Sequence, residues 1–188
     1  MAHPLHEIIA DVIETSLPHD LLLVRDPACS GQQRIPLFLA LEKSRATWIC
    51  DVDALIVVNQ EVRVIVEIDE SDVKPTKISG KFFNTVLADC YIHDSVGGAI
   101  RMAEAVTFMK FLSTSGLPTR THKRRQWKNI AKTIRSRLPL GNIAAYELFY
   151  GVPDDFRSGE LLSEVDLAVA KALRPTLANI NLGHELVV

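Results

Sequence analysis

Two neighbouring segments rich in β-branched residues, 48–58 and 62–69, constrain the fold of this 188-residue chain more than any other feature. The polar residues Asn59-Gln60-Glu61 separate them. This pattern predicts two antiparallel strands joined by a three-residue turn. Alternate positions of both segments are apolar, so one face of this hairpin is predicted to belong to the protein core.

The other face of the predicted hairpin is acidic. A three-residue turn places Asp53 opposite Glu67 and Asp51 opposite Asp69, with all four side chains on one face. Like charges opposite one another destabilise a sheet, and their proximity raises at least one pKa. A hard divalent cation such as Mg²⁺ removes this conflict, because it prefers carboxylate oxygens. The alternative is an exposed acidic sheet face that pairs with Arg63.

The remaining periodicities predict an α/β fold. The first helix, over residues 4–17, is expected to end at Pro18 and to be followed by a loop-rich stretch to residue 34. Further strands are predicted at 35–41, 105–113 and 144–150, and further helices at 76–92, 121–138 and 161–173. The order α-β-β-β-α-β-α-β-α predicts one domain over residues 1–188, with a mixed central β-sheet flanked by helices.

Composition excludes several classes of protein. Hydrophobic residues make up 47% of the chain and charged residues 23%, as in an ordinary globular domain. Apolar runs of five or six residues are too short for a transmembrane helix, and the acidic start MAHPLHEIIADVIE is unlike a secretory signal. Three cysteines without a CxxC spacing favour a reducing, cytoplasmic location. The sequence also lacks a P-loop, a GxSxG motif and an HExxH motif.

The net charge of −2 conceals a basic segment. Between Glu104 and Glu147 there is no acidic residue, whereas nine residues are Lys or Arg. Such a block is typical either of a surface that faces a polyanion or of a solvated helix face. Trp127 falls on the apolar side of this predicted helix and is expected in the core. The candidate nucleic-acid-binding residues, on the charged side of the helix, are Arg124, Arg125, Lys128, Lys132 and Arg135.

The acidic hairpin also carries a family resemblance. Asp53 in CDVDALIV, followed by Glu67-Ile68-Asp69 in VIVEIDES and then by a helix, resembles the PD-(D/E)XK nuclease superfamily. That superfamily includes type II restriction endonucleases and related repair and anti-phage nucleases. The resemblance covers residues 48–92. It implies a restriction endonuclease-like core, αβββαβ, extended here by C-terminal helices and a strand.

One position departs from the superfamily pattern. Asp69 stands where a lysine is usual, although some relatives supply a lysine from the following helix. Lys77 and Lys81 share one face of that predicted helix, whereas Lys74 lies in the preceding loop. From that helix, the ammonium group of either lysine is expected to be able to reach back toward Glu67. If both are ordinary surface residues, the chain is expected to have a nuclease fold without cleavage activity.

The resemblance implies a Mg²⁺-dependent DNA endonuclease of restriction, defence or repair type, with Mn²⁺ as an alternative ion. The implied metal ligands are Asp53, Glu67, Asp69 and the Ile68 carbonyl, and Lys77 or Lys81 would orient the attacking water. Asp51 would support the ligands, and Glu14 or Glu7 of the first helix would add an outer carboxylate.

DNA is the implied partner, and a homodimer would supply the two active sites that cut both strands. The sequence leaves two other interpretations open. One is a catalytically inactive nucleic-acid-binding protein with the nuclease fold. The other is an unrelated α/β binding protein whose acidic hairpin holds a structural cation.

Overall fold

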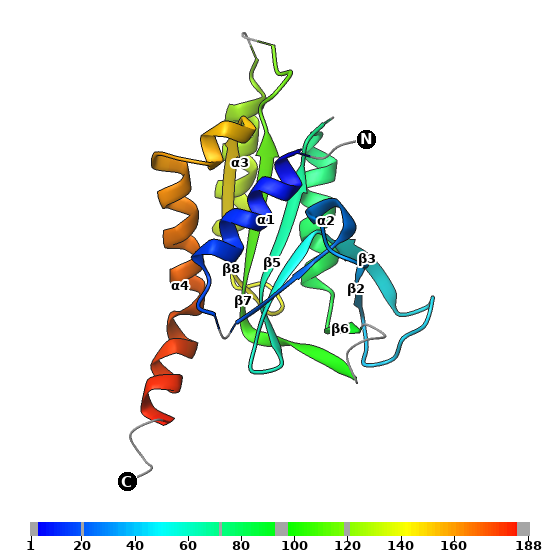
Figure 1. Cartoon of the computed structure of the whole chain (residues 1–188). Helices are drawn as coiled ribbons and strands as arrows, with labels where there is room; N and C mark the ends of the chain where they lie inside the picture. Colours follow the sequence, from blue (N-terminus) through cyan, green and yellow to red (C-terminus); the bar gives the residue numbers. More distant parts are fainter. Residues whose placement is uncertain (1–3, 20, 72, 93–97, 119–120, 184–188) are drawn as a thin grey trace.

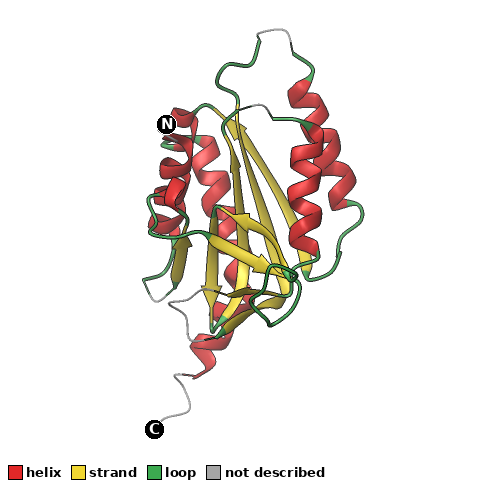
Figure 2. Cartoon of the chain, turned by 90° about the vertical axis from the view of Figure 1, so that its right-hand side faces the viewer, coloured by secondary structure: helices red, strands yellow, loops and turns green. Residues whose placement is uncertain are grey.

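A computed structural model describes residues 4–19, 21–71, 73–92, 98–118 and 121–183 of the chain (Figure 1). It shows an α/β protein with an open, mixed and mostly antiparallel β-sheet that has helices on both faces (Figure 2). The predicted class, a mixed sheet flanked by helices, is therefore confirmed. Within the described residues, no helix is both long enough and apolar enough to cross a membrane.

In the part of the chain that the structure describes, five strands separate the first two α-helices, and three more strands lie between the later helices. The helices are α1 (Pro4–Ser16), α2 (Pro75–Val86), α3 (Lys123–Arg135) and α4 (Glu160–Gly183), with short 3₁₀ helices η1 (Pro27–Cys29) and η2 (Pro153–Phe156). The strands are β1 (Leu22–Arg25), β2 (Ile35–Phe38), β3 (Trp48–Val52), β4 (Ala54–Val58), β5 (Glu61–Asp69), β6 (Cys90–Ile92), β7 (Ala99–Ser113) and β8 (Ile143–Gly151). Four predicted elements, at 4–17, 121–138, 144–150 and 161–173, therefore correspond to α1, α3, β8 and α4.

Strand β5 lies near the middle of the sheet. The strand order is β1-β4-β5-β7-β6-β2-β3, and β8 pairs with β7. β7 runs parallel to β5 and to β8, whereas the other pairs are antiparallel. The carboxyl ends of β5, β7 and β8 therefore meet at one edge of the sheet, where the acidic residues of β5 are found.

Both faces of the sheet are covered. Helices α1 and α4 pack on one face, where Ile56, Val66 and Phe111 contribute to the core. Helices α2 and α3 pack on the other, over Ile65 and Phe108. All five residues of β4 are buried, so this strand does not provide the exposed acidic sheet face that was the alternative to a cation site.

The hairpin turn differs from its prediction. It contains two residues, Asn59 and Gln60, both with positive φ, and Val58 pairs with Glu61. Positive φ at both central residues is the type I′ pattern, which matches the right-handed twist of the two strands. A bulge after Ile56 restores the predicted register deeper in the hairpin, so the error in turn length does not reach the acidic end.

The predicted strand over 48–58 is broken at Asp53. On the N-terminal side of Asp53, strand β3 pairs with β2 instead of β5, so Asp51 lies opposite Pro36. Asp69 pairs with Leu112 of β7. The predicted pairing of Asp51 with Asp69 is therefore wrong. The physical reason is that the carboxylate of Asp53 accepts a hydrogen bond from the backbone N–H of Ile68, at 2.6 Å, in place of the next backbone partner.

Three further boundaries were predicted incorrectly. The helix predicted over 76–92 ends at Val86, and residues 90–92 form strand β6 between β2 and β7. Cys90 lies four residues after Val86, so its apolar character fits a helix period as well as a buried strand. The apolar residues within 18–34 form β1, and β7 begins at Ala99 rather than at residue 105.

Candidate active site

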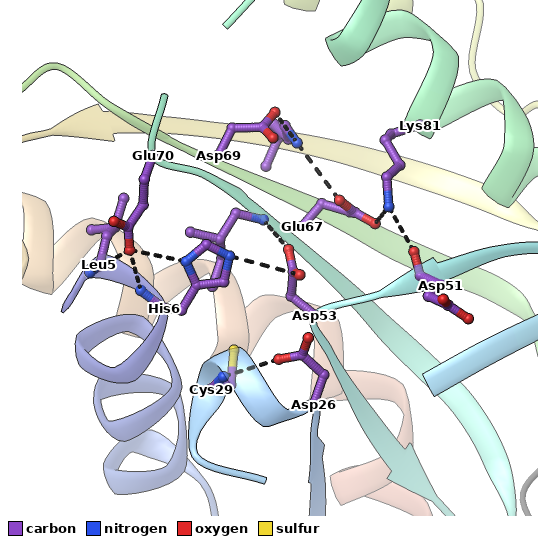
Figure 3. A network of polar contacts seen from close by, with 12 residues as sticks. Leu5, His6, Asp26, Cys29, Asp51, Asp53, Glu67, Asp69, Glu70 and Lys81 are labelled. Atoms are coloured by element: carbon purple, nitrogen blue, oxygen red, sulfur yellow. Dashed lines mark hydrogen bonds and ion pairs between the residues drawn. The ribbon is translucent and has the colours of Figure 1, made fainter. Parts of the chain in front are cut away.

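Acidic and basic side chains from β5, α2, β7 and the junction between β3 and β4 converge at the carboxyl end of β5, and Figure 3 shows several of them. Glu67 and Asp69 follow Ile65 at intervals of two, so they face the side of the sheet covered by α2. Strand β7 brings Lys110 beside Glu67 in the parallel register. We call this group the carboxylate cluster; its members are Asp53, Glu67, Asp69, Lys77, Lys81 and Lys110.

Asp53 and Glu67 are the two carboxylates that burial affects most. Burial raises the pKa of Asp53 to about 6, against the hydrogen bond from Ile68, and the neighbouring Asp26 adds to the rise. Burial and the negative charge of Asp53 raise the pKa of Glu67 to about 7. The charged forms of both groups are therefore costly, which is the condition under which a nearby cation is stabilising.

Lys81 reaches the cluster from α2. Its Nζ donates to Oε1 of Glu67 at 3.0 Å and to the backbone carbonyl of Asp51 at 2.7 Å. Burial disfavours the ammonium, but the charge of Glu67, its hydrogen bond and the charge of Asp53 together outweigh burial and raise the pKa of Lys81. The prediction that a helix lysine reaches Glu67 is confirmed as geometry, and its catalytic role stays a prediction.

Asp69 makes ion pairs with the two remaining lysines. Its carboxylate lies 2.6 Å from Nζ of Lys77 and 2.7 Å from Nζ of Lys110. Burial alone would raise the pKa of Asp69, but these two ammonium groups lower it. Asp69 is therefore a permanent anion, balanced by lysines from α2 and β7.

Lys110 was counted in the basic segment but was not predicted as a site residue. Its side chain is fully buried, and Nζ also lies 3.8 Å from Oε2 of Glu67. One signal in the sequence identifies it: Lys110 is a single cation inside the apolar run FMKFL of a predicted strand. A buried lysine is tolerated only beside an acidic partner, so this position implies a nearby carboxylate.

Helix α1 contributes a histidine rather than the predicted acids. His6 Nδ1 lies 2.9 Å from Oε1 of Glu70, and Nε2 lies 3.8 Å from Oδ1 of Asp53. The same oxygen of Glu70 accepts the N–H groups of Leu5 and His6, at the positively polarised start of α1. The predicted outer carboxylates do not fill this place, because Glu7 is exposed and Glu14 pairs with Arg25.

The side chain of Asp51 points away from the cluster. Its carboxylate contacts Arg34 and accepts a hydrogen bond from Nε1 of Trp48 at 3.2 Å. The side chain of Asp51 therefore does not support the proposed metal ligands as predicted. Its backbone carbonyl contacts the cluster by accepting a hydrogen bond from Lys81. Asp51 therefore links the β2–β3 hairpin to the cluster, as Figure 3 shows.

The five predicted nucleic-acid-binding residues of α3 are exposed, whereas Trp127 is fully buried, as predicted. Arg135 bonds to the Tyr146 carbonyl at 2.7 Å and to Glu147 at 2.9 Å, so strand β8 fixes this side chain. Lys128 lies over the ring of Tyr150 at 5.7 Å. Helix α3 packs on the same face of the sheet as α2, with these charged residues on its exposed side.

The donor groups of the cluster fit a hard cation in part. Asp53 and Glu67 supply carboxylates of raised pKa, and the Ile68 carbonyl points to the same side as its N–H, toward Asp53. One or two carboxylates suffice for Mg²⁺, which keeps several water ligands. Asp69 fits less well as a third ligand, because Lys77 and Lys110 already neutralise it. Across the described ranges, no group of three or more His, Cys, Asp or Glu side chains is arranged to hold a metal ion.

Fold and site together define an α/β protein with a partly buried cluster of carboxylates and lysines at the carboxyl edge of its sheet. No family model, curated protein or solved structure matches the chain. Its chemistry is therefore inferred from the geometry of the cluster.

Proposed function

We propose that this protein is a Mg²⁺-dependent endonuclease acting on DNA, with Asp53, Glu67 and Lys81 at its active centre. The observation that supports the proposal is the position of Lys81, whose ammonium bonds to the buried Glu67 carboxylate, itself next to Asp53. Two desolvated carboxylates beside a fixed ammonium match what phosphodiester hydrolysis requires: ligands for a divalent ion and a cation for the developing charge.

In this proposal Asp53, Glu67 and the Ile68 carbonyl hold the ion. An ion held there would supply positive charge to polarise the phosphodiester and to acidify a water molecule. Asp69 positions Lys77 and Lys110 through its two ion pairs rather than acting as a ligand. The superfamily resemblance and its restriction endonuclease-like core belong to the same proposal.

The two central side chains divide the proton chemistry between them. Lys81 has a raised pKa and stays protonated, so it donates hydrogen bonds to anionic oxygens and accepts no proton. Glu67, with a pKa of about 7, exchanges a proton near neutral pH. Because Glu67 would hold the ion as a carboxylate, ion binding would release this proton, and Glu67 is not the group that receives the proton of the attacking water.

The exposed cations of α3 provide the proposed contact with DNA phosphates. Arg124, Arg125, Lys128 and Lys132 are exposed, and Lys128 also lies over the ring of Tyr150, whereas Arg135 is held by β8. Each phosphate contact on a duplex adds roughly −0.9 to the slope of log K against log salt. Cleavage of both strands would involve a second copy of the chain, giving two-fold related active sites.

The decisive experiment is cleavage of supercoiled plasmid with MgCl₂ or with EDTA. Wild type is expected to nick or linearise plasmid only with Mg²⁺, and Glu67→Gln and Lys81→Met are expected to lose at least about 100-fold in rate. Glu164→Gln, an exposed carboxylate of α4, is the matched control and should cleave normally. Equal rates for wild type and Glu67→Gln would overturn the assignment.

A second candidate, a non-catalytic nucleic-acid-binding protein with this fold, is favoured by one observation. Three lysines surround the three carboxylates of the cluster, so its charges balance without an ion. In that case the chain would shift labelled DNA in a gel with EDTA present, and plasmid would stay intact in MgCl₂ or MnCl₂. Lys132→Ala would weaken the shift, whereas Glu67→Gln would leave it unchanged.

A further inference from the structure

A second cationic surface lies on the β2–β3 hairpin, away from α3. Its open pocket has a volume of about 470 Å³ and an apolar floor that includes Phe38. We call this surface the Trp48 patch; its lining includes Arg34, Phe38, Lys43, Arg45 and Trp48. None of these residues is among the site residues predicted from the sequence.

Trp48 is the central feature of the patch. Its side chain is 47% exposed, whereas the second tryptophan of the chain, Trp127, is completely buried. The indole is held in place, because Nε1 donates to Oδ1 of Asp51 at 3.2 Å. The preceding loop is also fixed: Ser44 accepts the backbone N–H of Trp48 at 3.0 Å, and Thr47 donates to the Glu42 carbonyl at 2.6 Å. A large aromatic ring is thus presented to solvent in a fixed orientation.

The patch connects directly to the carboxylate cluster. Asp51, which orients Trp48 through its carboxylate, holds Lys81 through its backbone carbonyl. Trp48 precedes Asp51 by three positions on β3, which corresponds to about 10 Å along the strand. A chain molecule that reaches Lys81 is therefore within a short distance of the exposed indole.

The composition of the patch selects one class of ligand. Arg34 and Arg45 are exposed guanidinium groups, which suit phosphate oxygens, and Arg34 also pairs with the Asp51 carboxylate, which lines the pocket too. An exposed indole face suits stacking with a nucleobase, and a groove that combines stacking rings with cations is typical of single-strand binding. An acidic peptide would use the cations but would have no need of the ring.

We infer that the Trp48 patch binds unpaired nucleotides of the nucleic-acid strand next to the carboxylate cluster, with a base stacked on Trp48 and phosphates on Arg34 and Arg45. The inference deepens the proposed nuclease function, because it places a single-stranded segment at the reacting end of the substrate. The patch itself needs neither Mg²⁺ nor cleavage in order to bind.

Tryptophan fluorescence offers a direct test, because Trp48 is accessible to a ligand and Trp127 is not. The protein is titrated with a short oligothymidylate in EDTA, and binding is also followed by anisotropy of a labelled copy. Wild type should show quenching that Trp48→Phe abolishes, while Trp48→Phe still binds. Trp48→Ala should weaken binding about 10-fold, and Arg34→Ala combined with Arg45→Ala should weaken it at least as much. Phe83→Ala, an exposed aromatic of α2, is the matched control and should bind like wild type.

The outcomes separate this inference from the proposed function. Absence of quenching, or equal affinity of Trp48→Ala and wild type for the oligonucleotide, would overturn the inference even if plasmid is cleaved. Tighter binding of poly-glutamate than of oligothymidylate would overturn it as well, since the patch would then be a protein-docking surface. Oligonucleotide binding through Trp48 without Mg²⁺-dependent cleavage would support the inference and remove the nuclease proposal.

Discussion

Lys110 and Asp69 form a buried ion pair between two parallel strands, with Nζ 2.7 Å from Oδ2. Lys110 is fully buried, and Asp69 is 4% exposed. Apart from ion pairs, neither atom has a hydrogen-bond partner among the described residues. Lys110 therefore depends on Asp69, because an isolated charge at this depth would be strongly unfavourable, whereas Asp69 also pairs with Lys77.

Lys110→Ala is expected to lower the free energy of unfolding by about 3–5 kcal/mol, because it leaves Asp69 and Glu67 without their buried counter-ion. Lys110→Met combined with Asp69→Asn should cost less than the sum of the single changes, since it removes both charges. Urea unfolding measures both effects. Lys132→Ala, at an exposed position of α3, should change stability by less than about 0.5 kcal/mol. Strict additivity in the double variant would contradict the pairing.

The raised pKa of Glu67 predicts a specific dependence of stability on pH. Its ordinary value is 4.5, and burial raises it to about 7 in the folded protein. Between these values the folded state binds more protons than the unfolded state, so the contribution of Glu67 to stability falls as pH rises from 4.5 to 7. Relative to Glu67→Gln, wild type should lose on the order of 2–3 kcal/mol across this range.

Thermal unfolding of both proteins over this pH range checks the prediction. Glu164→Gln serves as the control, and its difference from wild type should not change with pH because the carboxyl is exposed. A difference between wild type and Glu67→Gln that stays constant from pH 4.5 to 7 would show that Glu67 titrates normally. An increase in wild-type stability relative to the variant would have the wrong sign.

If Asp53 and Glu67 bind a metal ion, metal binding should restore above pH 7 the stability that is lost when Glu67 ionises. A ligand that binds only the folded state stabilises it by mass action. Millimolar MgCl₂ should therefore raise the melting temperature of wild type, and Asp53→Asn and Glu67→Gln should each abolish the rise. Calorimetric titration with MgCl₂ and with MnCl₂ gives the affinities directly. A rise that persists unchanged in both variants would place the ion elsewhere.

Glu70 should stabilise the start of α1. One oxygen of its carboxylate accepts the N–H groups of Leu5 and His6, which the helix itself leaves without partners. Glu70→Ala is expected to lower stability by about 1–2 kcal/mol, within the range of capping residues assisted by the helix dipole. Chemical denaturation measures the loss, and Glu42→Ala on an exposed loop is the control. An effect no larger than that of the control would show that the contact contributes nothing.

Local pattern was sufficient to predict the strands that carry Glu67 and Asp69 and the helix that carries Lys81. Each residue lies in a segment whose period is unmistakable, and the helix follows β5 after a short loop. Lys110 required a different kind of reasoning. Strand β7 was predicted, but its parallel pairing with β5 is a long-range contact that no local period encodes.

The break at Asp53 illustrates the limit of register arithmetic. The segment from Trp48 to Val58 has the composition of a strand on both sides of Asp53, so it gives no sign that β3 turns to pair with β2. The change of partner depends on the side chain of Asp53, which takes the place of a backbone acceptor for the N–H of Ile68. A contact of this kind forms only once the sheet is assembled, so the local sequence does not predict it. The approach of His6 to Asp53 is likewise tertiary, since 47 positions separate them in the sequence.

The hairpin turn provides a prediction that is independent of function. Asn59 and Gln60 both have positive φ, at 51° and 61°. Asparagine tolerates this conformation, whereas glutamine is strained in it and glycine is not. Gln60→Gly creates Asn-Gly, the preferred pair for a two-residue turn of this type, and should raise the free energy of unfolding by about 0.5–1 kcal/mol. Gln60→Val, which adds a β-branched side chain at the same φ, should lower it. Urea unfolding of wild type, Gln60→Gly and Gln60→Val measures these differences. If position 60 instead lay in a three-residue turn without positive φ, Gln60→Gly would be less stable than wild type.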